Sequence, residues 1–445
     1  MQPRKPSPTE SPLLFELDDE PLEETLTAWS GVPLVVQAFR SLGVPASVRQ
    51  HVHIKQRERG YDEATMVESF VVLNALGGDR VDDFAHLRED AGLKEMLGHE
   101  VPSPEAARQF LKQFHSEEKL EQARDGRKLE QIAFIPEEVD ALAGLGEVNR
   151  ELVRELGRRC PEQRIATVDQ DATIIESHKQ QALRTYEGER GYQPMLAVWA
   201  EMDAVLADEF RDGNVPAMMA PLAVAKRAFA ALPETVRSFY YRGDSASHEK
   251  ELLMWLRDER RADGPQGPIG FAISARMSAA LHQAIVRVPE AGWQMYGKAD
   301  SKEIRECAEV DFVPGEKSEH KDTQPLRYVA IRIRPRQEEF FADGQRVKHF
   351  AVASNLWEWK PERLIQWHRE KAGTIEAVHD VLTALKRIAL PAELLRARPK
   401  RLRFLIFNTA GRLVQHARKM RLRLAALEER IALWKEALRL LPVAT

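Results

Sequence analysis

The chain has 445 residues, of which 30% are charged, and a formal net charge of only −4. The length predicts about two or three domains with real apolar cores, and the overall charge does not favour a nucleic-acid partner. Two cysteines, Cys160 and Cys307, cannot form a disulfide framework. No apolar run approaches the roughly 18 residues of a membrane helix, and Met1–Ser11 lacks a signal-peptide core. We therefore expect a soluble, cytoplasmic protein with no membrane partner.

The first 130 residues predict a disordered lead over 1–20 and a helical domain over 21–130. Short helices are predicted over Arg80–Arg88 and Leu93–Leu97. A third begins at Ser103, a capping residue that precedes a proline. Three short helices, the last of them polar and basic, are compatible with a helix-turn-helix that reads a DNA groove. An ordinary helical bundle fits the same pattern, so both interpretations stay open.

The stretch from Ile165 to Ile175 predicts a strand, because it is rich in Thr, Val and Ile and contains few turn residues. Read at period two, Asp169 and Asp171 share one face of this strand. Carboxylates within a mostly apolar strand are costly unless a cation lies opposite them. A metal ion is the usual solution, and further ligands should then lie elsewhere in the chain.

An α/β region follows from 131 to 290. Three more strands are predicted, and the last ends at Gly243-Asp244-Ser245, before a helix that carries leucines on one side. In isolation Asp244 would be read as a helix cap. The three strands are Met195–Trp199, Val205–Phe210 and Ser238–Arg242.

Beyond residue 290 the predicted secondary structure changes twice. Residues 291–355 are expected to form a β-rich insertion, with strands at Tyr328–Ile333 and His349–Ala353. Residues 356–445 are expected to be helical, from Pro361 to about Ile388 and again from Arg403 to Leu440.

The first of these late helices carries a mixed stripe beside its apolar one. Glu376, His379 and Lys386 lie within about 80° of one another on a helix with 3.6 residues per turn. A solvated helix edge is the plain alternative. Glu370 competes with Glu376 for any metal role, although it lies off the stripe that contains Lys386.

Taken together, an aspartate in the first strand, Asp244 after a later strand and Glu376 on a late helix suit phosphoryl transfer with two divalent metals. Mg²⁺ prefers oxygen ligands, and Mn²⁺ could substitute for it. Two such ions about 3.5–4 Å apart activate the attacking oxygen and stabilise the leaving one. Without a cation, three converging carboxylates would repel one another.

At these segments the sequence resembles the DDE transposases of bacterial insertion sequences. The three acid segments resemble the family most specifically, and they are Thr167–Thr173 with Glu176–Lys179, Tyr241–Ala246, and Trp367–Leu382. The likeness extends from about Gly77 to Leu424 and includes Gly77–Phe84, Val101–Pro104, Tyr186–Gly188, Gly191–Pro194, Asp208–Asn214 and Phe407–Lys419.

The resemblance implies an α/β fold with an RNase H-like core, which is a mixed sheet flanked by helices. It also implies a β-rich insertion between the second and third acids and cut-and-paste DNA transposition. With this family, the helical segment over 21–130 is assigned as an N-terminal DNA-binding domain. It points to Asp169, Asp244 and Glu376 as the catalytic, metal-binding set. Asp169 is preferred to its neighbour Asp171 because the family places the acid directly after the apolar pair.

One departure from the family concerns the basic residues around the last acid. A related branch shows Tyr-x2-Arg-x3-Glu-x6-Lys. Here Ala372 lies four residues before Glu376, and Lys386 lies ten after it. The departure leaves open the roles of the nearby basic residues and whether a DNA hairpin intermediate forms.

Local charge favours DNA more than the global charge does. From Leu394 to Leu427 there are ten Lys or Arg residues and no Asp or Glu, a composition suited to phosphate contacts along helices. A basic face packed on acidic parts of the same chain remains the alternative. The candidate DNA contacts are His178, Lys179, Arg369, Lys371, His379, Lys386, Arg412, Arg418 and Lys419.

The sequence is thus identified as a Mg²⁺-dependent DDE transposase that cleaves double-stranded DNA at the terminal inverted repeats of a transposon and transfers the ends to target DNA. The family implies a homodimer in the DNA complex. A metal-dependent nuclease on the same core and an inactive DNA-binding protein are the alternatives.

Overall fold

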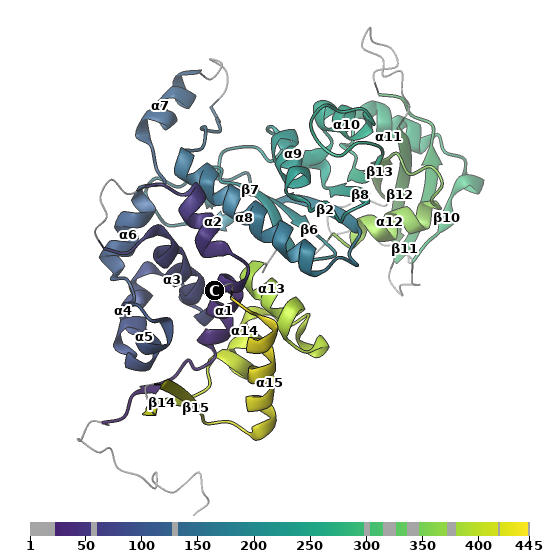
Figure 1. The fold of residues 1–445 in the computed structure, drawn as a ribbon. Helices are drawn as coiled ribbons and strands as arrows, with labels where there is room; N and C mark the ends of the chain where they lie inside the picture. Colours follow the sequence, from purple (N-terminus) through teal and green to yellow (C-terminus); the bar gives the residue numbers. More distant parts are fainter. Residues whose placement is uncertain are drawn as a thin grey trace, which may run out of the picture.

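The computed structural model describes residues 23–54, 60–126, 132–297, 303–314, 326–335, 347–371, 380–416 and 419–443. Figure 1 shows a helical part that contains both ends of the described chain, joined to a larger part built on a sheet. Within these described ranges, no helix is long and apolar enough to cross a membrane.

The sheet is built around five strands: β2 (Ile165–Ala172), β6 (Met195–Trp199), β7 (Ala204–Glu209), β8 (Ser238–Gly243) and β9 (Ile269–Ser274). Their spatial order is β7-β6-β2-β8-β9. β6 pairs antiparallel with β2 and β7, whereas β8 pairs parallel with β2 and β9. Three antiparallel strands followed by two parallel ones make the RNase H-like core, as predicted.

Four later strands extend this sheet beyond β9. They are β10 (Gln294–Met295), β11 (Glu303–Val310), β12 (Arg327–Pro335) and β13 (Lys348–Ser354), all antiparallel to their neighbours. In the described residues the sheet therefore has nine strands, and β13 pairs directly with β9. The predicted β-rich segment thus continues the core sheet.

A small separate sheet follows β2. It contains β3 (Ile175–Glu176), β4 (Leu183–Arg184) and β5 (Arg190–Tyr192), in the order β3-β5-β4.

The two faces of the large sheet carry different helices. Ile269, Phe271 and Ile273 of β9 face the main core, which they share with α9 (Pro221–Ala231), α10 (Lys250–Arg257) and α11 (Ala279–Val286). Ala272, between them, faces a smaller core with Leu364 and Ile365 of α12 (Pro361–Arg369). Since successive strand residues point to opposite faces, α12 covers the face opposite to α9–α11.

The N-terminal part is helical, as predicted. Ser103 begins α6 by accepting a hydrogen bond from the Ala106 N–H, and Asp62 and Asp90 cap α3 and α5 in the same way. The helices are α1 (Val32–Ser41), α2 (Val44–His51), α3 (Glu63–Leu76), α4 (Phe84–Glu89), α5 (Ala91–Leu97), α6 (Pro104–Lys112), α7 (Glu117–Gly126) and the connecting α8 (Asp140–Arg159).

The C-terminal part differs from the prediction. The helix expected from Arg403 to Leu440 is wrong between Gly411 and Leu424, where β14 (Gly411–His416) and β15 (Lys419–Leu424) form a hairpin. β14 also pairs with β1 (Leu26–Thr27). The remaining helices are α13 (Asp380–Ala389), α14 (Pro399–Leu402), a π-helical turn at Arg403–Phe407, and α15 (Glu428–Leu440).

Candidate functional site

The candidate site lies on the face of β2 and β8 that α12 covers. The pleat of β2 sends Ala166 and Val168 into the main core and leaves Asp169 and Asp171 on the opposite face. In β8 the same face carries Arg242, whose side chain bonds to Asp169. The two aspartates predicted from the first strand therefore lie on the sheet face that α12 covers.

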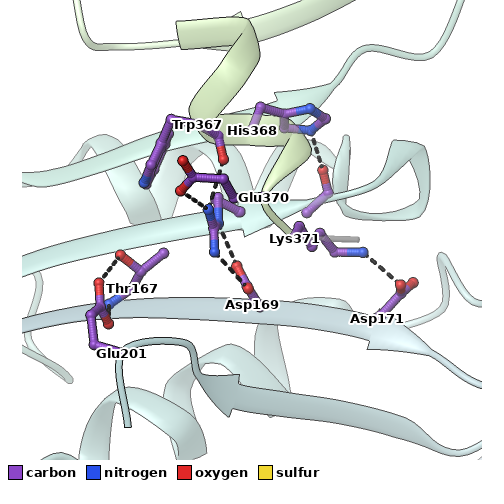
Figure 2. Close-up of polar contacts among 10 residues, drawn as sticks. Thr167, Asp169, Asp171, Glu201, Trp367, His368, Glu370 and Lys371 are labelled. Atoms are coloured by element: carbon purple, nitrogen blue, oxygen red, sulfur yellow. Dashed lines mark hydrogen bonds and ion pairs between the residues drawn. The ribbon is translucent and has the colours of Figure 1, made fainter. Parts of the chain in front are cut away.

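Asp169 is fully buried and is held by Arg242. The guanidinium Nε lies 2.6 Å from Asp169 Oδ1, and Nη2 lies 2.8 Å from Oδ2, so the contact is bidentate (Figure 2). The two residues are register partners on parallel strands. A buried carboxylate is tolerated only with such charge-assisted partners, so Arg242 is the cation that Asp169 requires.

Arg242 also reaches the end of α12. Its Nη1 donates to the Trp367 carbonyl oxygen at 2.7 Å and lies 3.3 Å from Glu370 Oε2. Its guanidinium carbon sits 5.2 Å from the centre of the Trp367 ring. One side chain therefore joins β2, β8 and the C-terminal end of α12. Trp367 also packs against Tyr240 and Trp359, in agreement with a packing role.

Asp171 lies one pleat further along β2 and has a different environment. Its side chain is 37% exposed, and the Lys371 ammonium lies 2.6 Å from Oδ2 (Figure 2). The last register pair of β2 and β8 is Gln170 with Gly243. Asp171 and Asp244 are the next residue on each strand, so both acids extend from the same end of adjacent parallel strands.

Asp244 directly follows β8 and caps the turn Ser245–Ser247, accepting a hydrogen bond from the Ala246 N–H at 3.0 Å. The pKa of Asp244 is raised, first by burial and then by the Asp171 carboxylate, while Lys371 opposes the rise. The two carboxylates therefore repel each other across the strand ends. This is the kind of oxygen donor pair that a hard divalent cation would stabilise.

The third acid of the predicted set cannot be placed. Glu376 lies outside the described residues, as does His379. Among the residues that are described, no three His, Cys, Asp or Glu side chains form a metal-binding group. Asp171 and Asp244 bring two carboxylates, the donor type that Mg²⁺ prefers, to the same end of adjacent strands.

A histidine of α12, His368, contacts the backbone of β8 next to Asp244. His368 Nε2 lies 3.1 Å from the carbonyl oxygen of Gly243 and 3.4 Å from Ser274 Oγ. Burial lowers the pKa of His368 to about 4, and nearby cations contribute. The imidazole is therefore neutral near pH 7 and fixes the backbone just before Asp244.

The predicted DNA contacts in this region have different environments. Lys371 is engaged with Asp171, and Arg369 is exposed with its guanidinium 5.3 Å from the Tyr296 ring centre. Lys386 is buried on α13, with Nζ 3.8 Å from Asp203 Oδ2, and burial lowers its pKa. A buried ammonium facing Asp203 is poorly placed to contact DNA.

The remaining predicted contacts are exposed or lie outside the described residues. His178 and Lys179 lie between β3 and β4 at the molecular surface. Arg412 and Lys419 are exposed on β14 and β15. Arg418 lies outside the described residues.

Sequence reasoning missed Arg242. A signal was present, because Arg242-Gly243-Asp244 and Asp169-Gln170-Asp171 have the same spacing. When the two strands pair in parallel, Arg242 faces the first aspartate and Asp244 lies beside the second.

The family comparison agrees with this geometry. A family model described as transposase DDE domain group 1 matches residues 23–378, a range that includes both strand acids and Glu376. A comparison with curated proteins gave no significant match. The match covers well over half of the 445 residues, so the chain belongs to the DDE transposase family.

Proposed function

We propose that this protein is a transposase that cleaves DNA at the ends of a mobile element and joins those ends to target DNA. In this proposal Asp171, Asp244 and Glu376 bind the divalent metal. The observation that supports it most directly is the placement of Asp171 and Asp244 at the ends of adjacent parallel strands, where each carboxylate lacks an arginine partner among the described residues.

This proposal places Asp171 where the sequence favoured Asp169. Both oxygens of Asp169 accept hydrogen bonds from Arg242, and the side chain has no exposed surface. Binding a metal at Asp169 would require displacing the guanidinium and leaving a second buried charge. Asp171 is partly exposed and pairs with a lysine through Oδ2 alone, so a metal there would displace one ion-pair contact and not a bidentate guanidinium.

The chain's own residues supply binding and positioning. Asp171 and Asp244 present carboxylate oxygens, and Arg242 holds the end of α12 over them through the Trp367 carbonyl. Lys371 places a positive charge beside Asp171, where it also favours the ionised form of Asp244. Two bound Mg²⁺ or Mn²⁺ ions would supply activation of the attacking oxygen and stabilisation of the leaving oxygen.

The partners proposed are the inverted repeats of the element and a target duplex, with a homodimer acting on two ends. Family membership supports a DNA partner in general. A nuclease on the same core would cut without joining, and an inactive DNA-binding protein would do neither. Strand transfer with precut ends separates these alternatives.

The test uses the inverted repeats found in the DNA flanking the gene, placed on a labelled duplex with Mg²⁺. We expect Asp171→Asn to reduce cleavage by at least about 100-fold, equivalent to ~2.7 kcal/mol of transition-state stabilisation. Asp263→Asn is a matched control, because Asp263 is an exposed aspartate paired with Lys226 at 2.7 Å. Wild-type cleavage by a folded Asp171→Asn protein would contradict the assignment.

A further inference from the structure

The hairpin of β14 and β15 has two different faces. On one face Leu413 is buried, and Leu422 and Leu424 are half-buried against the main core. The opposite face carries four exposed cations at alternating positions: Arg412 on β14, and Lys419, Arg421 and Arg423 on β15. The hairpin therefore presents a ribbon with one apolar and one basic side.

The basic side places like charges together. Arg412 and Arg423 are direct cross-strand partners, and like charges at such positions destabilise a sheet. Arg412 has an acid nearby, because its Nη1 lies 3.2 Å from Glu24 Oε1 at an exposed position. Among the described residues, Lys419, Arg421 and Arg423 form no ion pair with an acid. The arrangement suits an anion supplied from outside the chain.

Protection of a sheet edge is the plain explanation for cations on a ribbon, since lysine and arginine prevent edge-to-edge association. Edge protection could account for the cations on β15, which is an edge strand of the sheet β1-β14-β15. It does not account for Arg412, which lies on the middle strand and faces Arg423. A ligand with regularly spaced negative charge explains both strands.

We propose that the basic face of the β14–β15 ribbon binds duplex DNA. The proposal rests on the proposed function, and it assigns to the ribbon a binding role separate from cleavage. Figure 1 shows β14 and β15 at the opposite end of the molecule from α12 and β8. The ribbon therefore contacts DNA at a distance from the candidate metal-binding acids.

The dimensions support duplex DNA as the partner. Alternate residues on a strand are about 7 Å apart, which is close to the axial rise of two base pairs at about 3.4 Å each. Lys419, Arg421 and Arg423 thus form a row whose spacing matches every second phosphate of one DNA strand along the helix axis.

The experiment measures binding of the full-length protein to a fluorescein-labelled duplex by anisotropy, without metal, at several salt concentrations. Removing one phosphate-binding cation should reduce the slope of log K against log salt by about 0.9 and weaken binding roughly tenfold at ~0.1 M salt. We expect these changes for Arg421→Ala and for Arg423→Ala. Arg439→Ala is the control, because Arg439 is an exposed arginine of α15 already paired with Glu436.

Unchanged melting temperatures would show that the variants are folded. Wild-type affinity and salt slope in the double variant Arg421→Ala/Arg423→Ala would overturn the proposal. A larger reduction of affinity for single-stranded RNA or anionic vesicles than for duplex DNA would overturn the choice of partner. Cleavage by the Arg439→Ala protein with Mg²⁺ tests the proposed function independently of the ribbon. The proposal that the ribbon binds DNA can therefore be overturned while the proposed function is retained.

Discussion

Two successive positions on one face of the paired strands β2 and β8 accommodate carboxylates in different ways. At the first step, Asp169 is fully buried, and the chain supplies its counter-charge through Arg242 on the neighbouring strand. At the second, Asp171 and Asp244 project from the strand ends, and the pKa of Asp244 is raised. The first pair is a complete structural unit, whereas the second sets two carboxylates beside each other with the Lys371 ammonium as a nearby cation. A carboxylate on the same strand face as a candidate metal ligand is therefore not itself shown to be a ligand.

Breaking the Asp169–Arg242 pair should give the largest change in the free energy of unfolding. Arg242→Gln leaves the Asp169 charge buried without its partner, and we expect the free energy of unfolding to fall by about 3–5 kcal/mol. Urea unfolding followed by circular dichroism measures it. Arg439→Gln removes an exposed arginine–glutamate pair and should cost less than about 1 kcal/mol.

A double variant makes this test more specific. Adding Asp169→Asn to Arg242→Gln removes the buried carboxylate charge that has lost its partner. Part of the lost stability should therefore return. If Arg242→Gln destabilised the protein no more than Arg439→Gln, the structural assignment of the pair would be wrong.

A fourth carboxylate, Asp380, extends the comparison, because it is enclosed without an arginine partner among the described residues. Asp380 Oδ1 accepts a hydrogen bond from the Val205 N–H at 2.9 Å, and its Oδ2 is buried with no hydrogen-bond partner in the described part of the chain. Burial raises the pKa of Asp380 to about 7, and Asp203 and Asp208 add to the rise. Here a proton replaces the counter-charge.

The sign of the pH effect follows from this raised pKa. Between about pH 4 and pH 7 the folded protein holds a proton that the unfolded chain releases, so stability falls as the pH rises. Asp380→Asn keeps a hydrogen-bond acceptor and cannot ionise. We expect it to stabilise the protein by about 1–3 kcal/mol at pH 8 and to change little at pH 4. Thermal unfolding at the two pH values measures this, and equal effects at both would contradict it.

A much smaller change is expected at Glu370, the rival for the third acid. Its side chain is 68% exposed and lies 3.3 Å from Arg242 Nη1, so Glu370→Gln should change stability by less than about 1 kcal/mol. If Glu376 is the third acid, cleavage by this variant should stay within about threefold of wild type, a change of less than about 1 kcal/mol in the barrier. A reduction comparable to that of Asp171→Asn would instead place Glu370 in the metal site.

Much of the fold could be read from the sequence, because strong local patterns coincide with it. Ile165–Ala172 has the composition of a strand, and Ser103-Pro104 begins a helix as expected. The hairpin after Gly411 was missed because arginine, leucine and lysine also favour helices. The alternation Arg421-Leu422-Arg423-Leu424 was the available strand signal.

The candidate site was harder to read than the fold. Asp169 and Asp171 share a face, so period-two reasoning cannot separate them. What distinguishes them is the parallel register that sets Arg242 opposite Asp169, and that register depends on residues 73 positions apart. Long-range pairing of this kind has no local signature in a single sequence.

The pairing of β1 with β14 has a consequence for how the molecule is made. Leu26 finds its partner Arg412 only after almost 400 further residues have been made. Contacts between such distant segments form late, because a long loop must close first. The three-stranded sheet that presents the basic ribbon is therefore among the last parts to assemble, and a nascent chain that stops before Gly411 contains neither the ribbon nor the partner of Leu26.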